Sequence, residues 1–189
     1  MVDPSMDTTL HTAKLTPTGL NDEHAFEELY RHFFVRLFRF CYAIVHEKGP
    51  AEEIANDVFL NLWKRRGDLP AIDNLEVYLY VSAKNHCLNH LRRQRPQSSS
   101  LSIEDINEEA LQFQPDPESL LIGAETLKKV IAAIDQLPPR CKLIFRLIKE
   151  DGLRYKDVAR LLDLSVKTVE AQVAIAVRKI AQVLGPTQV

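Results

Sequence analysis

The fold is decided by residues 153–180, which read LRYKDVARLLDLSVKTVEAQVAIAVRKI. Apolar residues recur at the three- and four-residue spacing of a helix on both sides of Asp163-Leu164-Ser165. Asp tolerates a left-handed backbone better than most residues, and the Ser165 hydroxyl can accept an orphan amide of the following turn. The pattern therefore predicts two short helices joined by a tight turn.

The side chains of these two helices divide into an inner and an outer set. The expected inner set is Val158, Ala159 and Leu162 on the first helix and Val169, Val173, Val177 and Ile180 on the second. The expected outer set lies near the start of the second helix, where recognition helices meet base edges: Lys167, Thr168, Glu170 and Ala171. This layout predicts a helix-turn-helix. We favour it over an ordinary helical hairpin because the turn, the cap and the spacing of buried residues all agree.

The composition is typical of a soluble globular protein, and the cysteine content indicates the cellular compartment. The chain has 189 residues, of which 46% are hydrophobic and 26% charged. Its three cysteines, Cys41, Cys87 and Cys141, form no C-x-x-C pair, which favours buried free thiols in a reducing compartment. No apolar run reaches membrane-spanning length, and the first residues do not resemble a secretory signal. We therefore expect a cytoplasmic protein.

The formal net charge of -2 conceals an uneven distribution. Residues 96–124 carry six acidic and no basic residues, whereas residues 125–189 carry twelve basic and seven acidic residues. A weakly charged chain can still present a basic face to phosphates. The C-terminal part is therefore expected to bind nucleic acid, separated from the rest by an acidic connector.

Nearly every segment has the helical period and none alternates like a strand, so the predicted fold is all-α, with two small helical domains and a flexible acidic linker. A first helix begins after Asn21 or Asp22 and is stopped by Gly49-Pro50, and a second runs over 51–66. A third spans about Leu75 to Arg93, with Tyr78, Val81, Leu88 and Leu91 inward. The expected divisions are a disordered leader over 1–20, a first domain over 21–95, a linker over 96–118 and a second domain over 119–189.

The linker is expected to be unpacked, because it combines prolines, a serine run and acidic residues. Its apolar residues could instead dock on a partner: Leu101, Ile103, Leu111 and Phe113. Helical spacing returns from Ser119, and Pro139 is suited to open the next helix.

The third helix has a polar face made of Lys84, Asn85, Asn89, Arg92, Arg93 and Arg95. Asn and Arg read base edges, and Lys and Arg neutralise phosphates. Basic residues near a helix C-terminus are also favoured by the helix dipole alone. The residue types therefore leave two interpretations open, nucleic-acid binding and stabilisation of the helix end.

The sequence offers no chemistry of an enzyme. It contains no Gly-rich phosphate loop, no Ser-His-Asp set and no H-E-x-x-H motif. His86 and His90 lie four residues apart, but no third ligand stands at a telling spacing. The paired carboxylates Glu27-Glu28 and Glu52-Glu53 are explained by the dipole of early helical turns. We expect no catalytic residues, metal, cofactor or small-molecule substrate.

Three segments together resemble the bacterial sigma factors of the sigma-70 family, specifically the extracytoplasmic-function (ECF) group. The segments are FEELYRHFFVRLFRFCYAIV with AEEIANDVFLNLWKRR, then YLYVSAKNHCLNHLRR, and then AIDQLPPRCKLIFRLIKEDGLRYKDVARLLDLSVKTVEAQVAIAVRKI. The resemblance covers about residues 22–95 and 120–184 and implies sigma regions 2 and 4. It implies a non-enzymatic protein that binds core RNA polymerase, recognises two promoter elements and promotes promoter opening.

The resemblance also implies roles for particular residues. Those expected to bind the clamp coiled coil of the polymerase's largest subunit are Glu53, Asn56, Asp57, Leu60 and Trp63. Those expected at the downstream promoter element are Lys84, Asn85, Asn89, Arg92 and Arg93. Those expected at the upstream element are Arg154, Lys156, Lys167, Thr168, Glu170, Ala171 and Arg178. Other implied partners are the flap of the second-largest subunit and an anti-sigma factor, which could dock on the linker or on the face at 51–66.

A second reading stays open. The segment SVKTVEAQVAIAVRKI also resembles helix-turn-helix regulators of the LuxR type, which bind DNA as dimers. Such a regulator would carry a ligand pocket or a phosphorylatable βα domain, and residues 22–95 show the pattern of neither.

Overall fold

The computed structural model describes residues 23–66, 72, 74–94, 107, 109–111 and 124–184, and the described part of the chain contains helices and no strand. The elements are α1 (Glu23–Val45), α2 (Lys48–Lys64), α3 (Leu75–Gln94), the 3-10 turn η5 (Glu109–Leu111), α4 (Ala124–Asp135), α5 (Pro139–Lys149), α6 (Tyr155–Leu161) and α7 (Val166–Leu184). The predicted all-α fold is confirmed. Among the described helices, none is both long and apolar enough to span a membrane.

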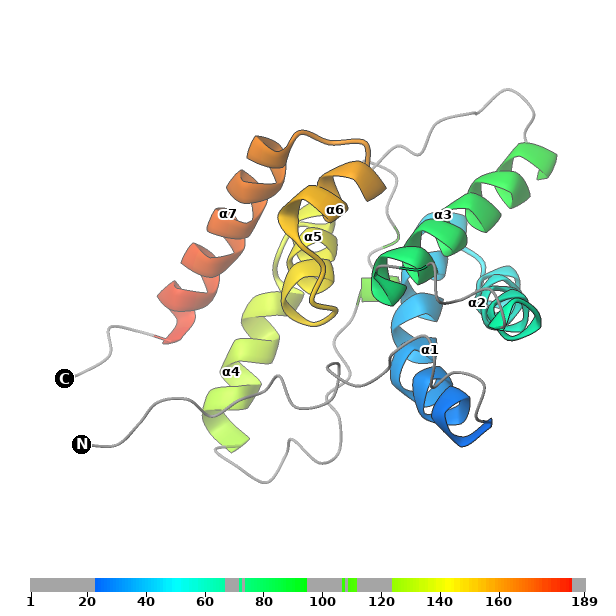
Figure 1. The fold of residues 1–189 in the computed structure, drawn as a ribbon. Coiled ribbons are helices and arrows are strands. Elements are labelled where there is room, and N and C mark those ends of the chain that lie inside the picture. The colour runs from blue at the N-terminus through cyan, green and yellow to red at the C-terminus, as the bar shows by residue number, and fades with distance from the viewer. Residues whose placement is uncertain are drawn as a thin grey trace.

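Helices α1, α2 and α3 pack together as the N-terminal half, and helices α4 to α7 form the C-terminal half (Figure 1). The core of the N-terminal half contains residues that recur at helical spacing on one face of α1, among them Leu29, Phe33, Leu37 and Phe40. The break between α1 and α2 lies elsewhere than predicted. α1 ends at Val45, His46 takes a left-handed φ of 66°, and Gly49-Pro50 belong to the first turn of α2.

The inward face of α3 also differs from the prediction. Its buried residues are Leu79, Tyr80, Ala83 and Cys87, while Tyr78, Leu88 and Leu91 are half-buried. Val81 is 37% exposed. Leu79, Tyr80 and Val81 are consecutive, so the apolar pattern did not determine which side of this helix faces the core.

Part of the predicted linker packs into the core. Ala110 and Leu111 of η5 are buried, and the amide of Asn107 donates to the carbonyl of Ala43 over 3.1 Å. The expectation of a wholly unpacked linker is therefore wrong at these residues, because the segment carries apolar side chains that gain from burial in the core. Leu101, Ile103 and Phe113 lie outside the described residues, as do Ser119 and Leu120.

In the C-terminal half, the turn and the helix start that the sequence predicted lie where expected. Pro139 opens α5 at the first helical position, and Gly152 takes a φ of 71° after that helix ends. Asp163 takes a φ of 54° in the turn, and the Ser165 hydroxyl accepts the amide of Thr168 at 3.0 Å. The left-handed turn and the serine cap are both confirmed.

Replacing Ser165 with Ala should lower the free energy of unfolding by about 1 kcal/mol, since it leaves the Thr168 amide without its acceptor. Urea unfolding of the full chain measures this, with Ser165→Asp as the matched variant that keeps an acceptor. Equal losses in both variants would show that the serine cap contributes nothing.

The two halves contact each other through a shared apolar core. α3 contacts α6, and α5 contacts η5, which itself packs on α1. Leu37 and Leu79 of the N-terminal half belong to one cluster of buried residues with Leu147 and Val158 of the C-terminal half. A second, smaller cluster joins α4, α5 and α7 around Cys141 and Ala176.

Candidate nucleic-acid and polymerase interface

Helices α6 and α7 form the helix-turn-helix. Val158, Ala159 and Leu162 are buried as predicted, and Leu164 packs against the core from within the turn. On α7, Val169 and Val173 are buried as predicted and Ile180 is half-buried. The burial of Val177 was predicted wrongly, because this residue is 49% exposed and Ala176 takes the inner position.

The start of α7 presents the outer set that the sequence predicted. Lys167, Glu170 and Ala171 are exposed, while Thr168 is half-buried and its hydroxyl lies 2.8 Å from that of Ser165. Arg178 is exposed but stands apart, because eleven residues of helix place it about 16 Å from Lys167 along the axis. Arg178 lines a shallow groove between α6 and α7, with Tyr155, Val173 and Val177.

The approach to α6 carries the other two upstream candidates. Arg154 precedes the helix and its Nε donates to Oδ2 of the buried Asp157 over 2.7 Å. Lys156, two residues further on in the first turn of α6, is exposed. A guanidinium held in this way keeps most of its surface in solvent and can contact a phosphate.

The polar face of α3 is exposed except at Lys84, and Arg95 lies outside the described residues. Asn85, Asn89, Arg92 and Arg93 all face solvent, and Nη1 of Arg92 lies 3.5 Å from Oδ1 of Asn89. The two arginines lie in the last turn, where the helix dipole also favours them. These four candidates therefore share one accessible end of α3.

Lys84 differs from its neighbours on α3. Its side chain is only 13% exposed, and its Nζ lies 2.6 Å from Oδ2 of Asp163 in the turn of the helix-turn-helix. A candidate DNA contact of the N-terminal half is thus paired with a carboxylate of the C-terminal half.

The outer face of α2 brings together the five predicted polymerase contacts. Glu53, Asn56 and Asp57 are exposed and Leu60 is 49% exposed. Trp63 is half-buried against Phe26, with ring centroids 4.8 Å apart, and the Arg66 guanidinium lies 4.3 Å from its ring. The Tyr30 hydroxyl donates to Oδ1 of Asn56 over 3.0 Å. The outer face of α2 thus carries two carboxylates, Glu53 and Asp57, and ends in the apolar side chains of Leu60 and Trp63. Contacts with α1 hold this face in place.

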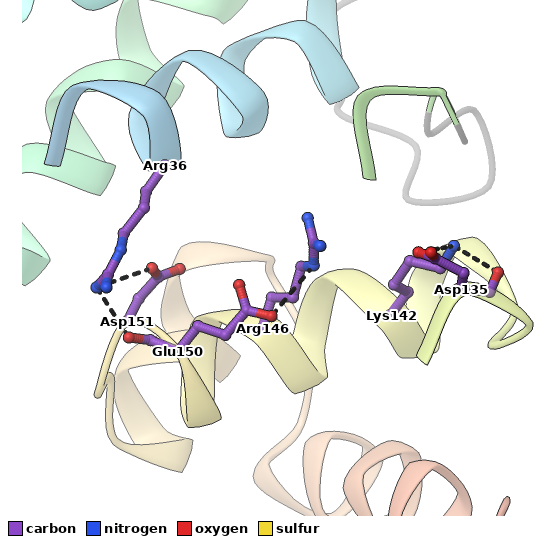
Figure 2. A network of polar contacts seen from close by, with 6 residues as sticks. All are labelled: Arg36, Asp135, Lys142, Arg146, Glu150 and Asp151. Carbon is purple, nitrogen blue, oxygen red and sulfur yellow. Dashed lines mark hydrogen bonds and ion pairs between the residues drawn. The ribbon is translucent and has the colours of Figure 1, made fainter. Parts of the chain in front are cut away.

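A buried polar network lies where α1 approaches the end of α5. Figure 2 shows the Arg36 side chain extending from α1 toward Asp151 and Glu150. Its Nη1 donates to the Glu150 carbonyl over 2.8 Å and lies 3.6 Å from Oδ1 of Asp151. Burial raises the pKa of Asp151 to about 6, although the Tyr80 hydroxyl and Arg36 both act to lower it. Burial likewise raises the pKa of Tyr80 well above its ordinary value.

The raised pKa of Asp151 makes stability depend on pH. The folded carboxyl holds its proton up to about pH 6, whereas the unfolded one releases it near its ordinary value of 3.8. The stabilisation is therefore full below the unfolded pKa and is lost as the pH rises through 6. Between pH 5 and 7 we expect a loss of about 1 kcal/mol from this group.

Urea unfolding of the wild type and of Asp151→Asn at both pH values isolates this contribution, because the amide does not titrate. A stability difference between the two chains that stays constant from pH 5 to 7 would show that Asp151 ionises normally.

The sequence did not reveal the contacts between the halves. Nothing in the residue pattern pairs Lys84 with Asp163 or Arg36 with Asp151, since each pair is formed by residues far apart in the chain. For the histidines, Nε2 of His90 lies 3.1 Å from Nε2 of Gln94. Within the part of the chain that the structure describes, no group of three or more potential metal ligands is found.

Within the described residues, the fold is that of a helical protein whose C-terminal half carries a helix-turn-helix. Comparison with known families places it further: residues 21–97 match Sigma-70 region 2, and residues 127–180 match Sigma-70, region 4. The chain belongs to the sigma-70 family of RNA polymerase sigma factors, in the ECF group. The predicted family is confirmed.

Relatives span most of the chain. The RNA polymerase sigma-H factor of Pseudomonas aeruginosa is 27% identical over 171 residues, covering 87% of this chain and 89% of the relative. The ECF RNA polymerase sigma-E factor of Escherichia coli K12 is 28% identical over 131 residues, covering 66% of this chain and 69% of the relative.

Two solved structures show a looser likeness. One is the sigma factor RpoE in complex with the anti-sigma factor NepR from Bartonella quintana, with a TM-score of 0.49, 17% identity, and coverage of 84% of this chain and 96% of that one. The other is CnrH in complex with the cytosolic domain of CnrY, with a TM-score of 0.43, 18% identity, and coverage of 89% and 92%.

Proposed function

We propose that this chain is a sigma factor that binds core RNA polymerase, recognises an upstream and a downstream promoter element and promotes promoter opening, with no catalytic chemistry of its own. The observation that carries the proposal is the presence, on one chain, of an exposed Asn/Arg face on α3 and a capped recognition helix at α7. Two DNA-reading surfaces in separate halves suit two separate elements of one promoter.

The polymerase contact is proposed for the outer face of α2. Glu53, Asp57 and Leu60 project from it, and the buried side of the helix is fixed by Val58, Phe59 and Leu62. A rigid helix with charged and apolar side chains at its centre has the make-up of a protein interface. We assign it to the clamp coiled coil of the largest subunit.

The downstream element is proposed to lie on α3. Asn85 and Asn89 can hydrogen-bond base edges, and Arg92 and Arg93 can hold phosphates. Opening the duplex there requires unstacking a base, which a pocket contact to the flipped base would offset. The upstream element is proposed to enter the helix-turn-helix, with Lys167 and Thr168 at base edges and Arg154 and Lys156 at the backbone.

Further protein partners belong to the same proposal. The groove between α6 and α7 has an apolar floor that includes Val173 and Val177, and we assign it to the flap of the second-largest subunit. An anti-sigma factor is proposed to dock on the outer face of α2 or on the linker, where it would compete with polymerase.

The alternative is a dimeric regulator of the LuxR type, and no observation favours it. In the described part of the N-terminal half, three helices surround an apolar core and no βα domain is found.

Size-exclusion chromatography with purified core RNA polymerase, and separately with fragmented genomic DNA, distinguishes the two functions. A sigma factor should co-elute with core enzyme and bind DNA only weakly alone. Tight, dimeric DNA binding without any complex with core enzyme would reject the proposal and support the regulator.

A further inference from the structure

The outer face of α7 carries a stripe of residues with the spacing of a helix–helix seam. The stripe runs along the groove between α6 and α7 and consists of Glu170, Ala174, Val177 and Ala181. These residues follow one another at intervals of four, three and four positions, the alternation by which one helix presents a seam to a second helix. Val177 is 49% exposed, and both alanines face solvent.

The position of α7 leaves this stripe accessible to a second molecule. Within the described residues the main neighbours of α7 are α4, α5 and α6. In Figure 1, α7 lies on the side of the C-terminal half that is turned away from α1, α2 and α3. Val173 forms the buried floor of the groove, so the stripe stands on a fixed support.

Opposite charges flank the middle of the stripe at equal distances. Glu170 precedes Ala174 by four residues and Arg178 follows it by four, so each lies about 6 Å from Ala174 along the helix axis. Both charged side chains are exposed, and within the described residues neither forms an ion pair. In an antiparallel pair of these helices centred on Ala174, Glu170 of each chain is level with Arg178 of the other. The face is therefore complementary to itself, as a two-fold interface between identical chains requires.

The apolar residues fit the same arrangement. Ala174 meets its own copy at the two-fold axis, and its short side chain permits the axis separation of about 8–10 Å that packed helices adopt. Val177 of one chain is then level with Ala171 of the other, because both lie three residues from Ala174. Pairing would cover Val177 on both chains and form two ion pairs.

We propose that two free chains pair antiparallel through the outer face of α7, with Ala174 at the two-fold axis and Glu170 of each chain against Arg178 of the other. The pairing itself does not depend on the function proposed above. Its consequence rests on that function, since the dimer covers both the groove assigned to the polymerase flap and Glu170 of the recognition helix. Core enzyme and the upstream element therefore compete with the second copy for α7.

The pairing is expected to be weak and reversible. It depends on a narrow apolar seam and on two exposed ion pairs, which contribute little each and are screened by salt. The dimer should therefore form at high protein concentration and dissociate on dilution or in concentrated salt.

Sedimentation equilibrium of the full-length free chain measures the dissociation constant of the dimer. Glu170→Arg places like charges opposite each other at both ends of the seam and should raise this constant by about tenfold or more, as should Arg178→Glu. A chain with both substitutions again has opposite charges at each end and should pair like the wild type. Lys179→Glu is the matched control, because it reverses an exposed charge of α7 that does not line the groove.

Circular dichroism checks the fold of each variant. A wild type that is monomeric at every concentration would overturn the proposal, as would a dimer that either single reversal leaves unchanged. A folded double variant that stays monomeric would overturn it too, because the proposed charge pairs are present in that chain.

The register of the pairing is tested by cross-linking in oxidised glutathione. Ala174→Cys should give a disulfide-linked dimer, since the residue at the two-fold axis meets its own copy. Ala171→Cys is the control, because its two copies lie about 9 Å apart along the axis, which is too far for a disulfide. The native cysteines are buried, so the wild type should not cross-link. Faster cross-linking of Ala171→Cys than of Ala174→Cys would contradict the register.

Addition of core RNA polymerase to the wild-type dimer tests the competition. Each core enzyme should take up one chain, and the free dimer should disappear as core enzyme is added. A complex that holds two chains per core enzyme would refute the competition. A wild type that pairs but forms no complex with core enzyme would refute the proposed function and leave the pairing standing.

Discussion

Replacing Asp57 with Arg should remove this chain from core RNA polymerase while leaving its fold intact. Asp57 is exposed near the middle of the outer face of α2, between Glu53 and Leu60. A reversed charge at the centre of an interface loses an attraction and leaves a partner charge unpaired, which costs about 2–5 kcal/mol. The affinity for core enzyme should therefore fall about thirtyfold or more.

The measurement is the dissociation constant for core enzyme, with thermal unfolding of each variant as the check on folding. Glu28→Arg is the matched control, because Glu28 lies about 160° around α1 from Phe26 and Tyr30, which pack against α2. Wild-type affinity in Asp57→Arg would remove the outer face of α2 from the polymerase interface.

Replacing Lys167 and Thr168 with Ala together should weaken holoenzyme binding at the upstream element and relax its sequence preference. Both residues lie in the first turn of α7, and Lys167 is exposed. Each side chain that reads a base edge contributes about 1–3 kcal/mol of discrimination. The expected loss is therefore between about fivefold and 150-fold per contacted base pair.

Competition binding with promoters altered base by base in the upstream element provides the measurement. Lys179→Ala is the matched control, since it removes one exposed positive charge from the same helix more than three turns further on. If both variants weaken binding equally at every sequence, Lys167 and Thr168 contribute only charge and do not read bases.

The sequence predicted those features that depend on local spacing. The helix-turn-helix was found because the Asp163 turn, the Ser165 cap and the inward residues of α6 all lie within one short stretch. The family followed from several such stretches in the same order, and it is confirmed. The family resemblance also selected the face of α2, whose five residues the structure brings together at the surface.

The predictions were wrong where the spacing of apolar residues was ambiguous, or where burial depends on residues far away in the sequence. On α3, three consecutive apolar residues left the phase open, and packing against α1 chose Leu79 and Tyr80 over Val81. Leu111 was assigned to a linker by its acidic surroundings, but α1 and α5 offer it a buried site. The pairing of Lys84 with Asp163 depends on how the two halves meet, which no local pattern encodes.

In vitro transcription with purified core RNA polymerase on a fragmented genomic library, with and without this chain, tests the sigma-factor function most directly. We expect discrete new start sites only when the chain is present, preceded by two shared sequence elements. Start sites identical in both reactions, from a chain shown to be folded, would contradict the account.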